Sequence, residues 1–340
     1  MSGVFSLIAV VLSFGITALL GKRFIPFLKR VNFGQTIREE GPKWHIKKDG
    51  TPTMGGIMFI IGIVAATIIA IPVYYAVTGR DTFAVFGETT LMQVKVFGGL
   101  FMAIGFGAIG FFDDYIKVVK KRNLGLTAWQ KLILQFLVAG AYLVTLYLAG
   151  EDTKTFIPAL GYVDLSFGYW ILSALLIVGM VNAVNFTDGI DGLNSSVTFF
   201  AALFFMLIGT VVDAVGISLL AVCIAGGCMG FLIWNFNPAK VFMGDTGSLF
   251  LGGAVCALGF GMDMPILLFP IGVVYITEIL SVVIQVVYFK ATGGKRLFKM
   301  SPIHHHFEMC GWSEIKICGV FSVVTVLFGI LALIWVMFGI

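Results

Sequence analysis

Residues 96–123 read VFGGLFMAIGFGAIGFFDDYIKVVKKRN, and they give the clearest indication of the kind of fold. Its apolar part, residues 96–112, contains no charged side chain and then meets two adjacent aspartates, followed by a group of basic residues. A helix needs about 20 apolar residues to cross the hydrocarbon core of a bilayer. The sequence therefore predicts a membrane-spanning helix that ends at a charged interface.

The same kind of apolar run recurs along the whole chain. Of its 340 residues 59% are hydrophobic and 12% are charged, whereas a soluble domain is nearer half apolar and about a quarter charged. We expect an all-α integral membrane protein, in which residues 1–340 form a single polytopic domain of about ten transmembrane helices. Two runs are short or closely joined, so nine spans is the alternative. The expected spans are residues 3–21, 53–77, 96–112, 132–149, 167–184, 194–212, 216–234, 248–262, 265–289 and 317–339.

Basic residues are distributed very unevenly over the connecting segments. If the N-terminus is outside, the inner segments hold 19 of the 22 lysines and arginines. Cytoplasmic loops of membrane proteins carry an excess of these residues. We therefore expect both termini on the extracytoplasmic side and the active-site loops in the cytoplasm. The inner segments are residues 22–52, 113–131, 185–193, 235–247 and 290–316.

The outer segments contain few residues that suggest chemistry. Their basic residues are Arg80, Lys95 and Lys154, and residues 153–168 are expected to form a small hairpin over the outer face. Glu278 is the one ionisable residue expected deep within a span. It indicates either chemistry in a groove or gate, or a buried hydrogen bond between helices.

The first candidate site is the pair Asp113 and Asp114. Lys117 and Lys121 follow Asp113 by one and two helical turns, so they share its face. Two carboxylates beside several cations suit a divalent metal and an anionic substrate. The alternative is a charged helix end whose basic residues only fix the topology.

The second candidate site is the segment NAVNFTDGIDGLNSS, residues 182–196. It combines Asn182, Asn185, Asp188 and Asp191 with glycines and holds no basic residue. Carboxylate and amide oxygens are ligands that hard cations prefer. An ordinary loop is the alternative interpretation.

The third candidate site is WNFNPAKVFMGDTGS, residues 234–248. Asn235, Lys240 and Asp245 are its polar residues, and Phe242 is an aromatic that could stack on a base. The alternative is a turn rich in proline and glycine between two spans.

Two further inner segments carry histidine and lysine. In KMSPIHHHFEMCGW (299–312), His304, His305 and His306 are adjacent, so on a helix they point about 100° apart and suit phosphate or carbonyl contacts better than one zinc ion. The other segment, HIKKDGTPTMGG (45–56), contributes His45, Lys47 and Lys48 beside glycines, which suits phosphate binding. For both, a solvated loop or a topology signal is the alternative.

These segments lie far apart in sequence but are all expected at one membrane face. Buried carboxylates near lipid are costly unless they are paired or bind a metal. A Mg²⁺ ion with lysines nearby is the partner set that fits best, because Mg²⁺ takes one or two carboxylates together with water and substrate phosphates.

Five motifs occur in the order of a known family. They are GTPTMGG (50–56), GFFDDYIKV (110–118), NAVNFTDGIDGL (182–193), VFMGDTGS (241–248) and PIHHHFE (302–308). With them the chain resembles, over nearly its whole length, the phospho-N-acetylmuramoyl-pentapeptide transferase family of the polyprenyl-phosphate N-acetylhexosamine-1-phosphate transferase superfamily. The aspartates are typical of the superfamily, and PIHHHFE indicates the muramoyl-pentapeptide branch.

The resemblance implies an activity and its partners. Phospho-MurNAc-pentapeptide would move from UDP-MurNAc-pentapeptide to undecaprenyl phosphate, giving lipid I and UMP with Mg²⁺ as cofactor. It also implies a homodimer among the lipids of the bacterial cytoplasmic membrane, acting in peptidoglycan synthesis, with no nucleic acid as partner.

The resemblance further implies roles for matching residues. Asp113, Asp114 and Asp245 match catalytic aspartates; Asp245 resembles the Mg²⁺ ligand, and the other two are further candidate ligands. The remaining matches are His304 and His305 as functional histidines, Lys48, Asp191, Asn235 and Phe242 in a uridine pocket, and Lys117 and Lys131 near the diphosphate. We also assign Asn182, Asn185, Asp188 and His306 to substrate binding.

Two rival functions are considered. One is the same chemistry on another sugar nucleotide, UDP-GlcNAc, against which the histidine segment argues. The other is a transporter, whose charged residues are expected near the bilayer midplane rather than at the inner ends of the spans.

Overall fold

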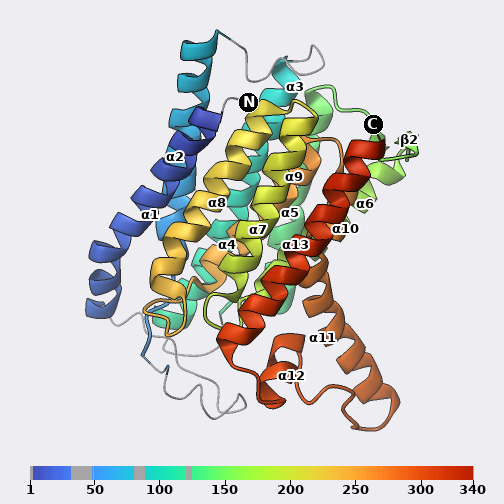
Figure 1. Ribbon diagram of the computed structural model, residues 1–340. Coiled ribbons are helices and arrows are strands. Elements are labelled where there is room, and N and C mark those ends of the chain that lie inside the picture. The colour runs from blue at the N-terminus through green and yellow to red at the C-terminus, as the bar shows by residue number, and fades with distance from the viewer. Residues whose placement is uncertain (1–2, 32–47, 49, 80–88, 120–124, 340) are drawn as a thin grey trace.

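A computed structural model describes residues 3–31, 48, 50–79, 89–119 and 125–339 as a bundle of long helices (Figure 1). Among these residues, nine helices are long and apolar enough to cross a membrane. In chain order the elements are α1 (Gly3–Arg30), α2 (Gly56–Thr78), α3 (Thr89–Gln93), the π-helix η2 (Val94–Gly98), α4 (Gly99–Val119), α5 (Ala128–Leu148), β1 (Lys154–Ile157), β2 (Gly161–Asp164), α6 (Gly168–Thr187), α7 (Leu193–Val211), α8 (Val215–Asn235), α9 (Gly244–Gly261), the 3₁₀-helix η3 (Pro265–Leu267), α10 (Leu268–Ile271), α11 (Val273–Ala291), α12 (Ile303–Met309) and α13 (Glu314–Gly339).

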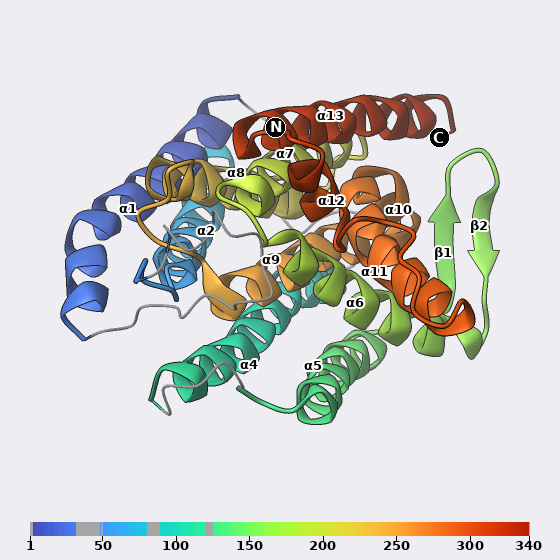
Figure 2. The same ribbon diagram turned by 90° about the horizontal axis from the view of Figure 1, so that it is seen from below.

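A helix lies at each of the ten expected spans. Helix α9 is not among the nine apolar candidates, because Asp245 and Thr246 in its first turn lower its apolar character. Its remaining turns are buried among α4, α6 and α7, and Figure 2, which looks along the bundle, shows α9 in the interior beside α4 and α6. At about 1.5 Å per residue, its 18 residues extend about 27 Å, close to the thickness of a hydrocarbon core.

Apolar side chains cover the outside of the bundle as well as its inside. Phe59, Phe106 and Phe205 belong to one connected buried core, whereas Val77 and Leu148 are exposed. In water such an exposed surface would be unfavourable. It suits a bundle whose surrounding solvent is lipid.

The expected span 265–289 was wrong as one continuous helix. The chain forms η3 and α10 and then turns at Gly272 before α11 begins. Pro270 lacks the backbone N–H that a continuous helix needs at this point, which explains the break. Below the break α11 leans away from the bundle (Figure 1) and exposes Val287 and other apolar side chains.

Both chain ends lie at the same end of the bundle, opposite α12 (Figure 1). The expected hairpin in residues 153–168 is confirmed: β1 pairs antiparallel with β2, from Lys154 opposite Asp164 to Ile157 opposite Gly161. It is the one pair of strands that the sequence predicted.

Lys95 was wrongly expected in an outer loop. It lies in the π-helix η2, is 3% exposed, and forms ion pairs with Glu151, at 2.8 Å, and with Asp263. The helical segment begins at Thr89, before the apolar run that predicted it, and so draws Lys95 into the bundle. Buried charges of this kind are retained when they are paired, and this ion pair ties η2 to the segments after α5 and α9.

We predict that Lys95→Met destabilises the protein by about 3 kcal/mol, because removing one partner of a buried ion pair leaves the other charges uncompensated. Thermal unfolding in detergent micelles measures the effect. Lys154→Met is the matched control, because Lys154 is 53% exposed in its pair with Asp152 and exposed pairs contribute little. Equal melting temperatures for the two variants would contradict this account.

Candidate active site

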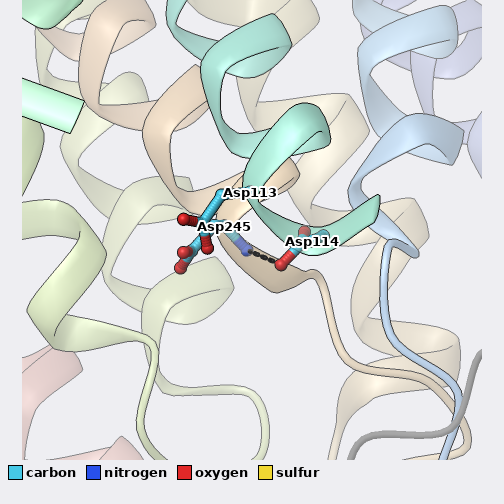
Figure 3. A group of neighbouring side chains, drawn as sticks. All are labelled: Asp113, Asp114 and Asp245. Atoms are coloured by element: carbon cyan, nitrogen blue, oxygen red, sulfur yellow. Dashed lines mark hydrogen bonds between the residues drawn. The ribbon is translucent and has the colours of Figure 1, made fainter. Parts of the chain in front are cut away.

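Three carboxylates from two helices meet at one point. Asp113 and Asp114 lie in the last two turns of α4, and Asp245 lies in the first turn of α9. One oxygen of each carboxylate lies within 4.8 Å of the others (Figure 3). Like charges this close repel each other strongly unless cations or N–H groups compensate them.

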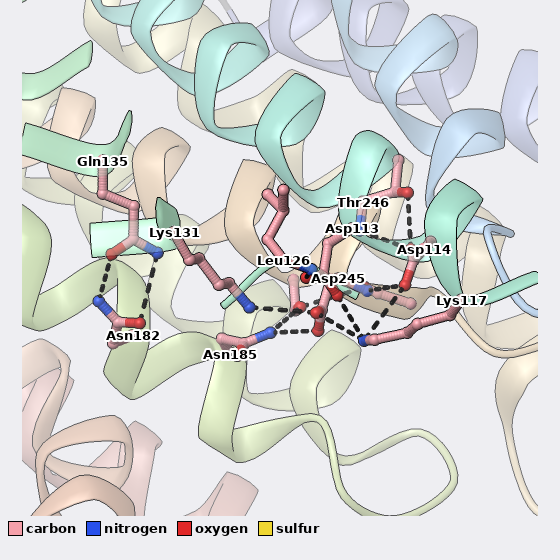
Figure 4. A network of polar contacts seen from close by, with 12 residues as sticks. Asp113, Asp114, Lys117, Leu126, Lys131, Gln135, Asn182, Asn185, Asp245 and Thr246 are labelled. Carbon is pink, nitrogen blue, oxygen red and sulfur yellow. Dashed lines mark hydrogen bonds and ion pairs between the residues drawn. The ribbon is translucent and has the colours of Figure 1, made fainter. Parts of the chain in front are cut away.

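Asp245 is at the centre of the compensating contacts (Figure 4). Its Oδ2 lies 3.0 Å from Lys117 Nζ and 3.1 Å from Lys131 Nζ, and its Oδ1 accepts a hydrogen bond from Asn185 at 2.9 Å. The Asp245 side chain is 20% exposed, against 4% for Asp113 and Asp114. It is therefore the carboxylate of the three that a ligand can best reach.

Asp114 holds the start of α9. Its Oδ2 accepts hydrogen bonds from the amide of Thr246 at 2.9 Å and from the Thr246 hydroxyl at 2.8 Å, and its Oδ1 accepts from the amide of Asp245 at 3.2 Å. The first amides of a helix have no partner within the helix. Asp114 therefore acts as a cap supplied by another helix, a role that the sequence pattern did not indicate.

Asp113 has a different set of contacts. Its Oδ2 lies 2.6 Å from Lys117 Nζ, and its Oδ1 accepts a hydrogen bond from the Leu126 amide at 2.8 Å. Lys117, one turn further along α4, thus contacts both Asp113 and Asp245. The expectation that lysine and aspartate share one helix face is confirmed here.

Close packing of α4 on α9 brings these groups together. A side chain at Gly110 would place its Cβ 2.1 Å from the carbonyl oxygen of Asp245, so only glycine fits there. Gly244 has a φ of +70°, and a Cβ on it would lie 2.4 Å from Asp114 Oδ2. Glycine adopts this backbone conformation without steric cost.

Two of the predicted amides have distinct surroundings. Asn185 donates to Ser248 Oγ at 2.7 Å as well as to Asp245, so it belongs to the aspartate site. Asn182 instead forms a pair of hydrogen bonds with Gln135 of α5, at 2.7 and 3.3 Å (Figure 4). Asn182 therefore ties α6 to α5, and Gln135 was missed although it interrupts an apolar run.

Asp188 follows the last residue of α6 and is half-buried. Burial raises the pKa of Asp188 well above its usual range, and the negative charges of Asp245, Asp114 and Asp191 raise it further. Its carboxyl group therefore keeps its proton at a higher pH than an exposed aspartate does.

A second polar cluster surrounds Asp191. Lys48 Nζ lies 2.7 Å from Asp191 Oδ1 and 2.6 Å from Oε1 of Glu314, the first residue of α13. Asp191 Oδ2 accepts hydrogen bonds from the side chain of Asn237 at 3.2 Å and from the amide of Ala239 at 2.9 Å. We name these five residues the Asp191 cluster; Glu314 was missed because an acid before an apolar run also suits a helix start.

Asn235 is bonded next to the Asp191 cluster, and Phe242 is bonded to the segment 50–56. Asn235 accepts a hydrogen bond from the Gly192 amide at 3.2 Å and donates to the Val241 carbonyl at 3.0 Å. Phe242 is half-buried, and its amide donates to the Pro52 carbonyl at 2.8 Å. This backbone pairing joins two of the predicted motifs, residues 50–56 and 241–248.

The three histidines lie on α12 and differ in their contacts. His304 is fully buried, with Nδ1 3.0 Å from Oε1 of Glu278 on α11. His305 Nδ1 lies 2.6 Å from Glu308, and His306 Nδ1 accepts a hydrogen bond from the Lys299 amide at 3.1 Å.

Within the described part of the chain, the cluster that could hold a metal consists of Asp113, Asp114 and Asp245, and none of the histidines belongs to it. Glu278 makes a buried contact between helices, with His304 as its partner, and its role in a groove or gate stays a prediction. The predicted residues His45, Lys47 and Lys121 lie outside the described residues.

The fold and this geometry define a class: a multi-pass membrane protein with carboxylates and lysines arranged for a cation and an anionic substrate. A family model described as "Glycosyl transferase family 4" matches residues 96–262, and a signature of phospho-N-acetylmuramoyl-pentapeptide-transferase matches residues 48–60. The chain is 45% identical to the phospho-N-acetylmuramoyl-pentapeptide-transferase of Geobacillus sp. (strain WCH70) over 333 residues, which is 97% of this chain and 98% of the relative.

Similar proteins come from other bacteria. The transferase of the same name from Halalkalibacterium halodurans is 45% identical over 97% of this chain and 98% of its own length, and that of Bacillus licheniformis is 45% identical over 96% of each chain. The chain belongs to the phospho-N-acetylmuramoyl-pentapeptide-transferase family.

We predict that Gly110→Ala lowers the free energy of unfolding by about 1–3 kcal/mol, the range for overpacking, because the new methyl group would press on the backbone of α9. Transferase activity should fall with it, since Asp245 would move. Gly140→Ala on α5 is the control: nothing lies within 4 Å of its Cβ position, and alanine favours helix. Unfolding in detergent checks both, and a neutral Gly110→Ala would count against close packing at this point.

Proposed function

We propose that this chain transfers phospho-MurNAc-pentapeptide from UDP-MurNAc-pentapeptide to undecaprenyl phosphate, giving lipid I and UMP for peptidoglycan synthesis. The observation that carries the proposal is the meeting of three carboxylates and two lysines in a chain that is 45% identical, over 97% of its length, to a transferase of that name. Phosphoryl transfer depends mainly on positioning and charge neutralisation, and this site offers both.

The charge balance of the site favours an added cation. When all groups are ionised, three carboxylates and two ammonium groups leave one negative charge. At an effective dielectric constant of about 20, two unit charges about 4 Å apart interact by about 4 kcal/mol. A diphosphate and a lipid phosphate would therefore be repelled, and a divalent cation would reverse the sign of the site.

The oxygen donors fit Mg²⁺, which is usually held by one or two carboxylates, water and substrate phosphates. Asp245 is the first candidate ligand because it is the most exposed, and Asp113 is the second because its Oδ2 lies 2.6 Å from the Lys117 ammonium and accepts no backbone hydrogen bond among the described contacts. Both oxygens of Asp114 accept hydrogen bonds from α9, which suits a supporting role. Bound Mg²⁺ would supply positive charge to the diphosphate oxygens.

Lys117 and Lys131 are proposed to bind the diphosphate. Both ammonium groups contact Asp245 in this structure. Phosphate oxygens accept strong charge-assisted hydrogen bonds from ammonium groups, so the diphosphate can replace Asp245 as their partner. The acceptor phosphate has a second pKa near 6 by analogy with phosphoserine, so it is already largely ionised at neutral pH. Asp113 therefore needs only to orient that phosphate.

The Asp191 cluster is proposed to bind the uridine end of the donor. Lys48 and Asp191 offer a donor and an acceptor, and Asn235 and Phe242 lie on the segment beside them. Asn185 connects this region to Asp245, because only a short stretch of chain separates it from Asp191. One nucleotide diphosphate could thus contact both clusters.

The three histidines are proposed to support substrate binding. His305 and His306 are partly exposed, so they can reach a substrate directly. His304 is fully buried. We therefore propose that it acts through its neighbours and not, as the resemblance implied, as a catalytic residue in contact with the substrate.

We further propose that residues 1–340 act as one membrane domain of ten spans in the bacterial cytoplasmic membrane, as a homodimer. Both chain ends would be extracytoplasmic and the aspartate site cytoplasmic. The position of both chain ends at the end opposite α12 (Figure 1) supports an even number of spans, and the excess of basic residues in the inner segments supports the orientation.

We predict that Asp245→Asn lowers the rate of UMP release at least about 100-fold, the effect typical of losing one charge-stabilising group. Purified protein is assayed with UDP-MurNAc-pentapeptide and undecaprenyl phosphate, with and without Mg²⁺. Wild-type protein should release UMP only with Mg²⁺ present.

Asp164→Asn is the matched control, because Asp164 is an exposed carboxylate of the hairpin. Full activity of Asp245→Asn would remove Asp245 from the site. Release of UMP from UDP-GlcNAc instead would indicate the rival sugar, and solute transport by liposomes without UMP release would indicate a transporter.

A further inference from the structure

The first residue of the last long helix contacts two other parts of the chain. Both carboxylate oxygens of Glu314 approach Lys48 Nζ, Oε1 at 2.6 Å and Oε2 at 2.7 Å. Oε2 also accepts a hydrogen bond from the backbone amide of Asp191 at 2.9 Å. One carboxylate on α13 thus binds both the lysine and the loop that carries its partner.

Within the Asp191 cluster, Asp191 is fixed from several directions. Its amide bonds to Glu314, its Oδ2 to Asn237 and Ala239, and its side chain is 1% exposed. The Cys318 thiol lies 3.2 Å from its carbonyl oxygen. Asp191 therefore has a rigid position before any ligand binds.

Lys48 is the adaptable member of the cluster. Its side chain is 20% exposed, and a lysine stem has four carbons with many rotamers, whose ordering costs free energy. An ammonium group has three N–H donors. In the described contacts Asp191 Oδ1 and both oxygens of Glu314 lie within hydrogen-bond distance of the Lys48 ammonium. A carbonyl oxygen of a ligand can take the place of one Glu314 oxygen, because the other oxygen still holds the ammonium.

We propose that Glu314 is a positioning residue for the nucleotide: it holds the Lys48 ammonium against Asp191, so that the lysine is ordered before the ligand binds. The inference rests on the proposed function, in which Lys48 and Asp191 contact the uridine. Pre-ordering improves affinity because less rotamer freedom is lost on binding.

A purely structural role for Glu314 is the competing explanation. An acidic residue in the first turn of a helix stabilises the helix through its dipole. That role would change stability when Glu314 is replaced, but it would not act selectively on nucleotide affinity or depend on Lys48.

The experiment compares wild type with Glu314→Gln, which keeps an oxygen that can accept from the Asp191 amide and removes the charge that holds Lys48. Equilibrium binding of UMP should weaken about tenfold, the equivalent of one modest charge-assisted hydrogen bond. In turnover assays the KM for UDP-MurNAc-pentapeptide should rise by a similar factor, with kcat changed less than about twofold and the KM for undecaprenyl phosphate unchanged.

A double-mutant cycle tests whether the effect passes through Lys48. Lys48→Met and the double variant Lys48→Met/Glu314→Gln should bind UMP equally weakly, because Glu314 has nothing left to position. Asp152→Asn, an exposed carboxylate of the hairpin region, is the control that should bind like wild type.

Several results would overturn the proposal. They are unchanged UMP affinity in Glu314→Gln, a fall in kcat with KM unchanged, or additive effects in the double variant. Wild-type protein that binds UMP but releases none from the sugar nucleotide would refute the proposed function while leaving the Glu314 inference testable by binding. Wild-type protein that does not bind UMP would refute both.

Discussion

The contact between the last turns of α4 and the first turn of α9 is the constraint on which the site depends. It buries Asp113 and Asp114 beside Asp245, an arrangement that would be unfavourable without compensation. The negative charges are compensated by the amides at the start of α9, which donate hydrogen bonds to Asp114, and by the ammonium groups of Lys117 and Lys131. Glycine at position 110 permits this close approach. The close packing of α4 on α9 therefore also brings the three carboxylates together.

The segment between α6 and α7 joins the two polar clusters. Asn185, in the last turn of α6, bonds to Asp245, and Asp191, in the segment itself, bonds to Lys48 and to the start of α13. Because this segment is short and held at both ends, the spacing between the aspartate site and the Asp191 cluster is set by the backbone. A nucleotide diphosphate has a limited reach between its base and its phosphates, and a rigid spacing of the two clusters favours molecules that span it.

The sequence predicted the features that depend on local pattern. Long apolar runs located the helices, and the motif order indicated that Asp113, Asp114 and Asp245 would meet. It did not predict features that depend on a distant partner. Lys95 was assigned to a loop because its acidic partners follow it by more than fifty and more than a hundred residues. The capping of α9 by Asp114, the pairing of Asn182 with Gln135 and the contact of Glu314 with Lys48 were missed for the same reason. The apolar run by itself also does not reveal the break at Gly272, which follows Pro270.

Binding of Mn²⁺ as a substitute for Mg²⁺, followed by electron paramagnetic resonance of the purified protein, tests most directly whether these carboxylates form one cation site. We expect one ion per chain, a large loss of affinity in Asp113→Asn, and tighter binding in Lys117→Met, because that ammonium contacts the same carboxylates. Mn²⁺ affinity that is the same in all three proteins would contradict this expectation.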